Sequence, residues 1–244
     1  MIYLRVALTS VWMILACLLG LAGCLVRWGD PIMNRHFGRF FAWGATRLSG
    51  IRVVFEGLEH LEAHQPCIYV SNHQSSMDMA VLGDIFPRNT VLVGKKELIY
   101  IPLFGLFFKG AGNIMINRSR RVSAMASLSE AVEQIRKRRL SVYVFPEGTR
   151  NRSEAPMLPF KRGAFYMAIQ AQVPIVPVVC SSLDRVMSWK EKRMQGGTVR
   201  VRVLPPIPTQ SYAAADAEQL GREVRDQMIT AWSEISRVGS VSGS

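Results

Sequence analysis

The sequence predicts an α/β fold, in which helices cover a mixed sheet and an N-terminal two-helix motif anchors the chain to a membrane. Three observations support this prediction. Short β-branched runs alternate with helical stretches over residues 50–237. A long uncharged apolar run opens the chain. Hydrophobic residues make up 49% of the 244 residues and charged residues 20%, which is typical of a folded chain.

The first apolar run extends from Val6 to Val26 and contains no charged residue between Arg5 and Arg27. At about 1.5 Å per helical residue, it is long enough to cross roughly 30 Å of hydrocarbon. Leu21–Cys24 resembles a lipoprotein cleavage motif, but an apolar and basic helix follows it instead of a polar tether. The run is also longer than most buried core helices. We therefore expect a membrane anchor, and the sequence leaves open whether it spans the bilayer or stays within one leaflet.

A second helix is predicted between Asp30 and Gly50. Asp30 is a good N-cap, proline is favoured at the first helical position, and glycine ends helices. Its side chains are mainly aromatic and basic: Phe37, Phe40, Phe41, Trp43, Arg35, Arg39 and Arg47. Such helices lie in the membrane interface. Residues 1–49 are thus predicted to form a two-helix membrane motif. The arginines after the first helix outnumber those before it, so the rest of the chain is expected to face the cytoplasm.

Residues 50–237 are predicted to form one α/β domain, followed by a flexible Gly/Ser-rich tail at 238–244. The predicted strands are Ile51–Phe55, Cys67–Ser71, Val91–Val93, Ile114–Ile116, Ser141–Phe145, Ile175–Cys180 and Thr198–Leu204. The predicted helices are Asp78–Ile85, Val122–Arg138, Ala164–Ala171 and Asp216–Ser236. Ligands of such folds gather at the carboxyl ends of the strands.

The net charge of +12 indicates an anionic partner. Nucleic acid is disfavoured because the chain has no signature of a nucleic-acid-binding motif and opens with an apolar run. The expected partner is an anionic membrane surface, and a basic membrane-binding protein without catalysis stays as an alternative. No metal site is expected: the cysteines form no CxxC pair, and His60 and His64 have the spacing of a metal pair but no third ligand.

The first chemical motif contains His73 and Asp78 after a predicted strand. Residues five apart do not face each other on one helix, so the two side chains meet only if His73 lies in a loop and Asp78 in the first helical turn. Asp78 would then fix the imidazole tautomer and leave the other nitrogen as a base. A serine hydrolase would need a G-x-S-x-G elbow, which is missing. We therefore expect His73 to activate a hydroxyl of the substrate.

The next two motifs offer binding groups at strand ends. Gly112–Arg118 delivers Arg118, which can bind phosphate with two hydrogen bonds. In Phe145–Arg150, Gly148 permits close approach of a ligand, Thr149 and Arg150 offer donors to phosphate, and Glu147 can hold a substrate hydroxyl or order the arginines.

Three weaker motifs follow other strands or helices. Lys95 is a further phosphate ligand or a surface charge. Phe160–Gly163 opens a helix, whose N-terminus attracts anions. The prolines in Val173–Val178 predict an edge strand or a bulge, which either lines an acyl groove or packs in the core.

Together these motifs resemble those of the glycerolipid acyltransferase family, and within it the bacterial 1-acylglycerol-3-phosphate acyltransferases. The resemblance covers roughly residues 50–205. It rests on four blocks in the family's order and on a fifth similar stretch: His73–Asp78 (an H-x4-D motif), Gly112–Arg118, Phe145–Arg150, Val173–Val178 and Gly94–Leu98. The N-terminal helices resemble the family's membrane-docking element.

The resemblance implies transfer of a fatty acyl chain from acyl-CoA or acyl-carrier-protein to the sn-2 hydroxyl of 1-acylglycerol 3-phosphate, giving phosphatidic acid at the inner membrane. It implies no metal and no cofactor besides the donor. It implies His73 as general base, Asp78 as its orienter, and Arg118, Glu147 and Arg150 in substrate binding. Another lyso-lipid, such as a lyso-aminolipid, and glycerol 3-phosphate stay as alternative acceptors.

Overall fold

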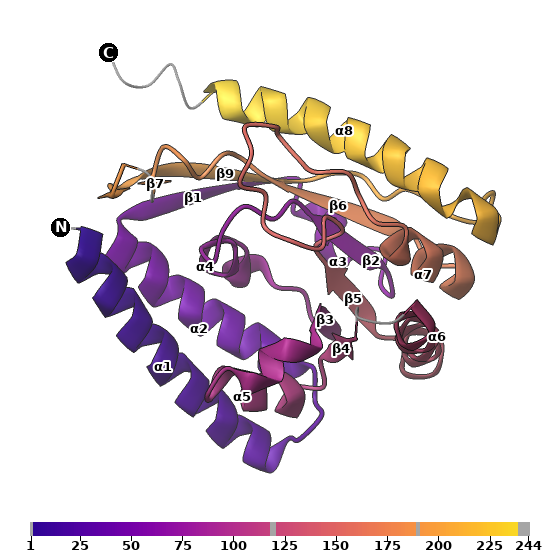
Figure 1. The fold of residues 1–244 in the computed structure, drawn as a ribbon, viewed down its shortest axis with the longest axis horizontal. Coiled ribbons are helices and arrows are strands. Elements are labelled where there is room, and N and C mark those ends of the chain that lie inside the picture. Colours follow the sequence, from indigo (N-terminus) through magenta and orange to yellow (C-terminus); the bar gives the residue numbers. More distant parts are fainter. Residues whose placement is uncertain (1, 118–120, 189–190, 239–244) are drawn as a thin grey trace.

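The computed structural model describes residues 2–117, 121–188 and 191–238. A seven-stranded sheet with the order β1-β9-β6-β2-β5-β3-β4 forms its centre (Figure 1). The strands are β1 (Ile51–Glu56), β2 (Ile68–Ser71), β3 (Thr90–Lys95), β4 (Ile114–Ile116), β5 (Ser141–Val144), β6 (Ile175–Cys180) and β9 (Gly197–Val203). A separate small hairpin consists of β7 (Met187–Ser188) and β8 (Arg193–Met194).

The helices surround this sheet. The α-helices are α1 (Ile2–Val26), α2 (Ile32–Ser49), α3 (Glu59–Glu62), α4 (Asp78–Leu82), α5 (Phe104–Gly110), α6 (Arg121–Arg138), α7 (Gly163–Ala171) and α8 (Ala217–Val238). The 3-10 turns are η1 (Gly83–Ile85), η2 (Lys96–Tyr100) and η3 (Ala214–Asp216). The helix α8 includes the first residue of the predicted tail, and residues 239–244 lie outside the described part of the chain.

The sheet is mixed, as predicted. Strands β6, β2, β5, β3 and β4 are parallel, β9 runs antiparallel to β6, and β1 is parallel to β9. The carboxyl ends of the five parallel strands therefore lie along one edge of the sheet. They are Cys180, Ser71, Lys95, Ile116 and Val144. The loops that carry the predicted motifs leave from this edge.

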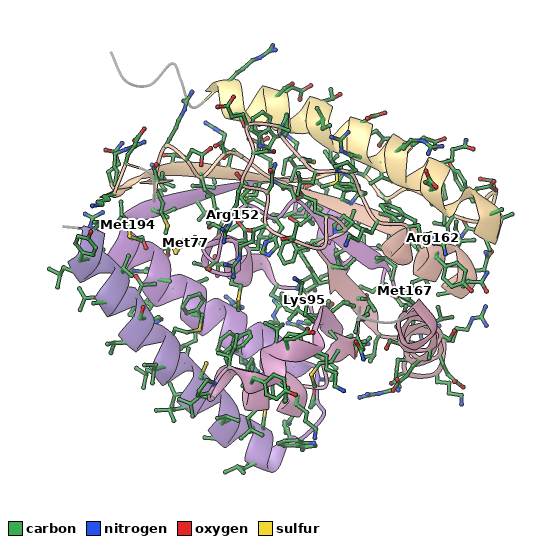
Figure 2. All side chains as sticks on the ribbon, viewed as in Figure 1. Met77, Lys95, Arg152, Arg162, Met167 and Met194 are labelled. Carbon is green, nitrogen blue, oxygen red and sulfur yellow. The ribbon has the colours of Figure 1, made fainter. Side chains whose placement is uncertain are left out.

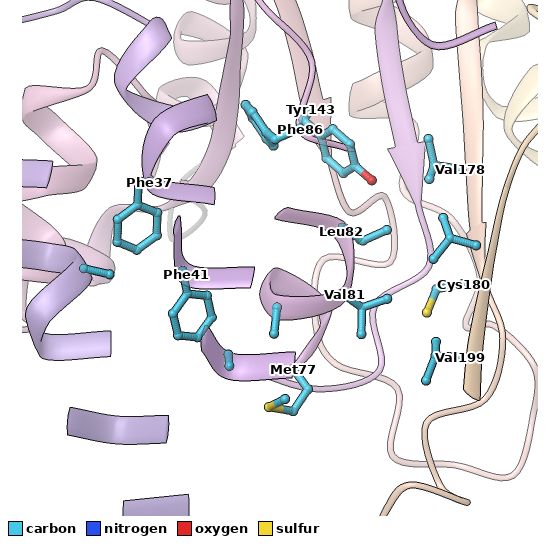
Figure 3. Packing of buried hydrophobic residues seen from close by; sticks show 14 of the residues in the cluster. Phe37, Phe41, Met77, Val81, Leu82, Phe86, Tyr143, Val178, Cys180 and Val199 are labelled. Atoms are coloured by element: carbon cyan, nitrogen blue, oxygen red, sulfur yellow. The ribbon is translucent and has the colours of Figure 1, made fainter. Parts of the chain in front are cut away.

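Helices cover both faces of the sheet, with α1, α2, α4 and α5 on one side and α6, α7 and α8 on the other (Figure 1). Successive residues of β6 enter different cores: Val178 packs on the α2 side and Val179 on the α8 side. Figure 3 shows Val81 of α4 between Phe41 of α2 and Val199 of β9. Burial on both faces explains why the central strands are apolar throughout instead of alternating.

The two N-terminal helices pack side by side. The Trp12 ring stacks on Phe40 with centroids 4.5 Å apart, and its Nε1–H donates to the Phe40 carbonyl at 3.1 Å. A Cβ atom at Gly44 would lie 2.1 Å from the Trp12 ring, so glycine makes this approach possible. The first helix is also tied to the rest of the chain at both ends. Arg5 donates to the carbonyl of Ser49 in α2 at 2.7 Å and to that of Met194 in the α/β domain at 3.4 Å, and Gly29 N–H, just after the helix, donates to the carbonyl of Gly110 at 2.7 Å.

A buried polar pair joins α2 to the sheet. Asn34 and Asn113 exchange two side-chain hydrogen bonds of 2.9 and 2.8 Å. The Asn34 amide also donates to the carbonyls of Thr90 and Ala111. Only 2% of Asn34 is exposed to solvent, and buried polar groups of this kind need such partners. The helix α2 is therefore part of the α/β core as well as of the N-terminal pair.

The seven predicted strands and the predicted helices are present, with ends that differ by a few residues. Asp30 caps α2 through its side chain, which accepts the Ile32 N–H at 3.0 Å, although the helix begins one residue later than expected. The helices α3 and α5 and the β7–β8 hairpin were not predicted from the sequence, and these elements span only 2 to 7 residues each. Such lengths are too short for a hydrophobic period to be recognised.

Pro177 lies in β6, in the interior of the sheet, and Pro174 directly precedes this strand, so the expected edge position is wrong and the bulge is right. Val178 pairs with Val203, whereas Ile175 bridges to Ile207. Three steps along β6 thus face four steps along the neighbouring chain, which places one extra residue opposite Pro177. Because the regular ladder is interrupted there, the missing N–H of Pro177 removes no bond, and its carbonyl still accepts Leu204 N–H at 2.9 Å.

Candidate active site

His73 and Asp78 meet as the sequence predicted. His73 lies in the loop after β2, Asp78 is the first residue of α4, and His73 Nδ1 is 2.7 Å from Asp78 Oδ2. Asp78 is fully buried, while 22% of the His73 side chain is exposed. With Nδ1 held by the carboxylate, Nε2 is the nitrogen that can take up a proton.

Backbone amides of the same loop fix the Asp78 carboxylate. Its Oδ2 also accepts the N–H groups of Gln74 at 2.7 Å and Ser75 at 3.0 Å. Ser75 in turn accepts the N–H of Met77 through its hydroxyl at 2.9 Å, which caps the start of α4. The loop therefore folds around the carboxylate, and the orientation of His73 is set locally.

Glu147 connects this loop to the loop after β5. Its Oε1 accepts the backbone N–H of His73 at 2.6 Å, and its Oε2 accepts the N–H of Leu158 at 2.8 Å. Asn151 N–H donates back to the carbonyl of His73 at 2.7 Å. Only 2% of Glu147 is exposed, and burial raises the pKa of its carboxyl, while the two N–H donors act in the opposite direction. Both carboxylate oxygens thus order the backbone.

Two amide side chains that the sequence analysis left without a role attach the His73 loop to β6. Asn72 is fully buried and pairs with the backbone of Cys180 through two hydrogen bonds of 2.9 Å. Gln74 donates to the carbonyl of Ser181 at 3.0 Å and accepts the N–H of Leu183 at 3.2 Å. Both residues flank His73 in the sequence, which could have suggested a role at the site. Their partners could not be predicted because they lie more than 100 residues away in the sequence.

An aromatic ring supports the imidazole. The rings of His73 and Phe145 stack with centroids 4.2 Å apart and planes inclined by 21°. Phe145 follows β5 directly, where Gly148 has a φ of +73° and its N–H donates to the Phe145 carbonyl at 3.1 Å. This turn needs a residue that tolerates positive φ, and it brings the third motif against His73.

The cationic groups predicted to bind substrate lie along the same edge. Lys95 ends β3 and is exposed, and Thr149 and Arg150 are exposed beyond the turn at Gly148. Figure 2 labels Lys95 at the end of β3 and Arg152 in the loop after β5. Arg118 lies outside the described residues. The strand β4 that precedes it ends at this edge, next to β3.

No thiol in the described residues is suited to be a nucleophile. All four cysteines are buried. Burial and the Asp78 carboxylate raise the pKa of Cys180, the one nearest to the His73 loop, well above its usual value. With Nε2 as a base and no activated thiol, the arrangement is suited to removing a proton from a hydroxyl that a substrate brings.

Two cavities among the described residues lie away from the His73 loop, and neither is lined by His73. One, of about 720 Å³, lies at the opposite edge of the sheet and is lined by His64, Arg136 and Gln172, among others. The other, of about 280 Å³, is lined by Asn113, Gln134 and neighbouring residues. Within the described residues, no group of three His, Cys, Asp or Glu side chains could hold a metal ion.

A family model described as Acyltransferase matches residues 52–181 of this chain, which includes the His73 loop and the loop after β5. The human 1-acyl-sn-glycerol-3-phosphate acyltransferase alpha is 39% identical over 241 residues, covering 99% of this chain and 84% of that protein. The Escherichia coli (strain K12) 1-acyl-sn-glycerol-3-phosphate acyltransferase is 37% identical over 229 residues, covering 93% and 92%.

The fold is also that of a solved structure. The crystal structure of the 1-acyl-sn-glycerophosphate (LPA) acyltransferase PlsC from Thermotoga maritima superposes with a TM-score of 0.74 at 21% identity, covering 96% of this chain and 95% of that one. The identities to the curated relatives extend over nearly the full length of both proteins, and the matched region contains the His73–Asp78 pair. This chain therefore belongs to the acyltransferase family.

Proposed function

We propose that this enzyme transfers a fatty acyl chain from a thioester donor to the sn-2 hydroxyl of 1-acylglycerol 3-phosphate and forms phosphatidic acid. The observation that carries the proposal is the 2.7 Å contact between His73 Nδ1 and the buried Asp78 carboxylate. It leaves Nε2 as a base for a substrate hydroxyl in a chain whose relatives are named for this acceptor. The donor is acyl-CoA or acyl-carrier-protein, and no other cofactor is needed.

In the proposed reaction, His73 Nε2 removes the proton of the acceptor hydroxyl as its oxygen attacks the thioester carbonyl. The new C–O ester bond forms, the C–S bond breaks, and the imidazolium returns the proton to the thiolate that leaves. Asp78 keeps the imidazole in the correct tautomer and stabilises its charged form. A positioned general base contributes about 10²- to 10⁴-fold to the rate.

The phosphate of the acceptor selects the substrate in this proposal. Lys95 ends β3, and Thr149 and Arg150 follow the neighbouring strand β5. Their two positive charges and one hydroxyl donor favour an anionic ligand. Arg118 follows the next strand and is proposed to complete the group. Guanidinium groups bind phosphate oxygens in a bidentate manner, so the arginines are expected to carry most of the selection.

The enzyme is proposed to lie on the cytoplasmic face of an anionic inner membrane, with α1 embedded in one leaflet. The helix α1 is long and apolar enough to cross a membrane, yet hydrogen bonds tie it to the α/β domain at both ends, from Arg5 to the Met194 carbonyl and from Gly29, just after the helix, to the Gly110 carbonyl. A helix held along a globular domain in this way cannot stand across a bilayer without carrying that domain into the hydrocarbon. Both ties therefore favour the monotopic arrangement over the spanning one.

The test is acyl transfer to detergent-dispersed 1-acylglycerol 3-phosphate from labelled acyl-CoA and from labelled acyl-carrier-protein. Wild type is compared with His73→Ala and with His60→Ala. His60 lies in α3, which follows β1 at the edge of the sheet opposite to His73. We expect product from wild type and His60→Ala, and a loss of at least about 10²-fold for His73→Ala. Equal rates for all three proteins would overturn the role of His73. A product only with a lyso-aminolipid or glycerol 3-phosphate would overturn the proposed acceptor.

A further inference from the structure

The segment between the active-site edge and α1 exposes large apolar side chains. Tyr100 is 79% exposed, Ile101 46% and Leu106 50%, in η2, α5 and the turn that joins them. We propose that Tyr100–Leu106 is a second membrane-contacting element, which enters the interface of an anionic lipid bilayer beside α1. The inference rests on the proposed membrane location and adds to it the part of the α/β domain that meets the lipid.

The helix α5, which contains Leu106, packs against α1. A Cβ atom at Gly20 would lie 2.7 Å from the Phe107 ring, and that ring stacks on Phe37 of α2 at 4.3 Å. At the end of α5, the Gly110 backbone accepts a hydrogen bond from Gly29, and Cys24 packs against the same glycine. Figure 1 shows α5 next to the C-terminal half of α1. Any surface that α1 enters is therefore also close to α5.

Both faces of α5 carry apolar side chains. Phe107 and Phe108 point inward and are 2% and 4% exposed, while Leu106 points outward. The exposed Lys109 lies on the outer face beside Leu106, and a helix surface that pairs apolar side chains with cations is suited to a membrane interface. Leu106 adds to the exposed apolar side chains of the adjacent α1, which include Leu8, Val11, Ile14, Leu15, Leu18 and Leu19. Exposed apolar surface of this kind marks a membrane or protein contact.

The charges around the segment favour an anionic bilayer over an apolar protein partner. Lys95, Lys96 and Lys109 are exposed beside it, against one exposed carboxylate at Glu97, so residues 95–110 carry three positive and one negative charge. Cations at the edge of an apolar patch bind acidic lipid headgroups. The exposed Tyr100 ring has an apolar body and a polar hydroxyl, which suits the depth of the headgroups.

The backbone keeps the exposed residues in place. Leu103 has a φ of +61°, a conformation that a leucine rarely adopts, directly after Pro102. The turn is closed by a bond from Gly105 N–H to the Ile101 carbonyl at 2.8 Å. A Cβ atom at Gly105 would lie 2.4 Å from the Ile99 carbonyl oxygen, so only glycine fits there. Strained turns of this type persist where the surrounding structure and the function require them.

The position of the element explains how a lipid acceptor reaches the base. The turn η2 starts at the carboxyl end of β3, on the same sheet edge as the His73 loop, and α5 ends on α1. With Tyr100–Leu106 in the headgroup region, the exposed Lys95 lies between the bilayer and the catalytic loop. An acceptor can then move from the membrane to His73 without leaving the interface.

The first experiment measures the depth of single labelled positions. All four native cysteines are buried, so Ile101→Cys and Leu106→Cys can be labelled selectively with an environment-sensitive fluorophore. Val11→Cys on α1 is the positive control. Leu58→Cys is the matched control because Leu58 is 45% exposed and follows β1, whose carboxyl end lies at the opposite edge of the sheet.

We expect labels at 101 and 106 to shift to shorter wavelength and to be quenched by spin-labelled lipid in vesicles of phosphatidylglycerol and phosphatidylethanolamine. The label at 58 should stay as it is in water. If the label at 11 is quenched while those at 101 and 106 behave like the one at 58, the proposal is wrong. If the emission of the labels at 101 and 106 shifts in detergent without vesicles and the protein is a dimer, Tyr100–Leu106 contacts a second copy of the chain. That result would also overturn the proposal.

The second experiment separates the surface from the chemistry. Ile101→Glu and Leu106→Glu should lower acyl transfer to vesicle-borne 1-acylglycerol 3-phosphate by at least about tenfold relative to Leu58→Glu. Their rates on detergent-dispersed acceptor should stay within about twofold of wild type. An equal loss in both assays would mean damage to the site and would contradict the proposal. If wild type transfers no acyl chain in either assay, the proposed function fails while the fluorescence still tests the surface.

Discussion

The Glu147 carboxylate holds the backbone of the catalytic loop, because its Oε1 accepts the His73 N–H at 2.6 Å and its Oε2 accepts the Leu158 N–H at 2.8 Å. In Glu147→Gln, one oxygen is replaced by an NH₂ group that faces an N–H donor. We expect a loss of about 1–3 kcal/mol in the free energy of unfolding and a lower kcat. Denaturant titration and steady-state kinetics measure the two effects, with the exposed Glu154→Gln from the same loop as control. A large rise in the KM for acceptor with unchanged kcat would instead favour direct substrate binding by Glu147.

The stability difference between wild type and Glu147→Gln should depend on pH. Burial raises the pKa of Glu147 above its unfolded value of about 4.3, so the folded protein binds this proton more tightly than the unfolded chain. The resulting stabilisation is fully present below the unfolded pKa and is lost as pH rises through the folded one. We therefore expect the difference between the unfolding free energies of wild type and Glu147→Gln to fall as pH rises above about 4. A difference that grows with pH would contradict this assignment.

Asp78→Asn tests the charge behind His73. An asparagine oxygen can keep the hydrogen bonds that Oδ2 accepts from His73 and the loop amides, but it cannot stabilise an imidazolium. We expect kcat to fall by about 10²- to 10⁴-fold with little change in circular dichroism. Asp84→Asn removes an exposed carboxylate of the neighbouring η1 turn and should leave kcat unaltered. Retention of wild-type kcat in Asp78→Asn would exclude the proposed His73–Asp78 mechanism.

Arg150→Ala tests recognition of the acceptor phosphate. The side chain is exposed just beyond the turn at Gly148, next to the His73 loop. Loss of a charge-assisted bond to phosphate should raise the KM for 1-acylglycerol 3-phosphate by about tenfold and the KM for the donor far less. Arg152→Ala, two residues further along the same loop, is the control for net charge. Equal increases for both substrates would show that Arg150 does not select the acceptor.

The Asn34–Asn113 pair should be essential for attaching α2. Replacement of either residue by alanine leaves the partner amide buried without its reciprocal bonds, so each variant should lose about 1–3 kcal/mol of unfolding free energy. Since the two amides depend on each other, the double variant should lose clearly less than the sum of the two single losses. Denaturant titration of all four proteins in the same detergent measures this coupling, and strict additivity would argue against it.

Local spacing was enough to predict the parts of the site that lie within one segment. The five-residue step from His73 to Asp78 permits contact only across a loop and a helix start, and the structure has this arrangement. Runs such as Ile175–Cys180 are apolar because helices cover both sides of the sheet, so the strands were found with nearly correct ends.

What the sequence did not reveal depends on contacts between distant segments. The bond from His73 to Glu147 joins residues 74 positions apart, and that from Asn72 to Cys180 spans 108. No periodicity encodes such pairs, so Glu147 was predicted to bind substrate and Asn72 received no role. The bulge opposite Pro177 depends in the same way on a neighbouring strand whose register the sequence does not give. The role of Arg118 stays a prediction.

The ties at the two ends of α1 also constrain how the protein is made. The guanidinium of Arg5 binds the carbonyls of Ser49 and Met194, and Gly29 binds Gly110, so the last of these acceptors comes about four-fifths of the way along the sequence. The helix α1 leaves the ribosome before all of these partners and is thus among the last elements to gain its complete set of neighbours. Until Met194 has been translated, the apolar surface of α1 must be covered by lipid or by a chaperone. Membrane association is therefore expected to begin during translation, before the catalytic loop has its final form.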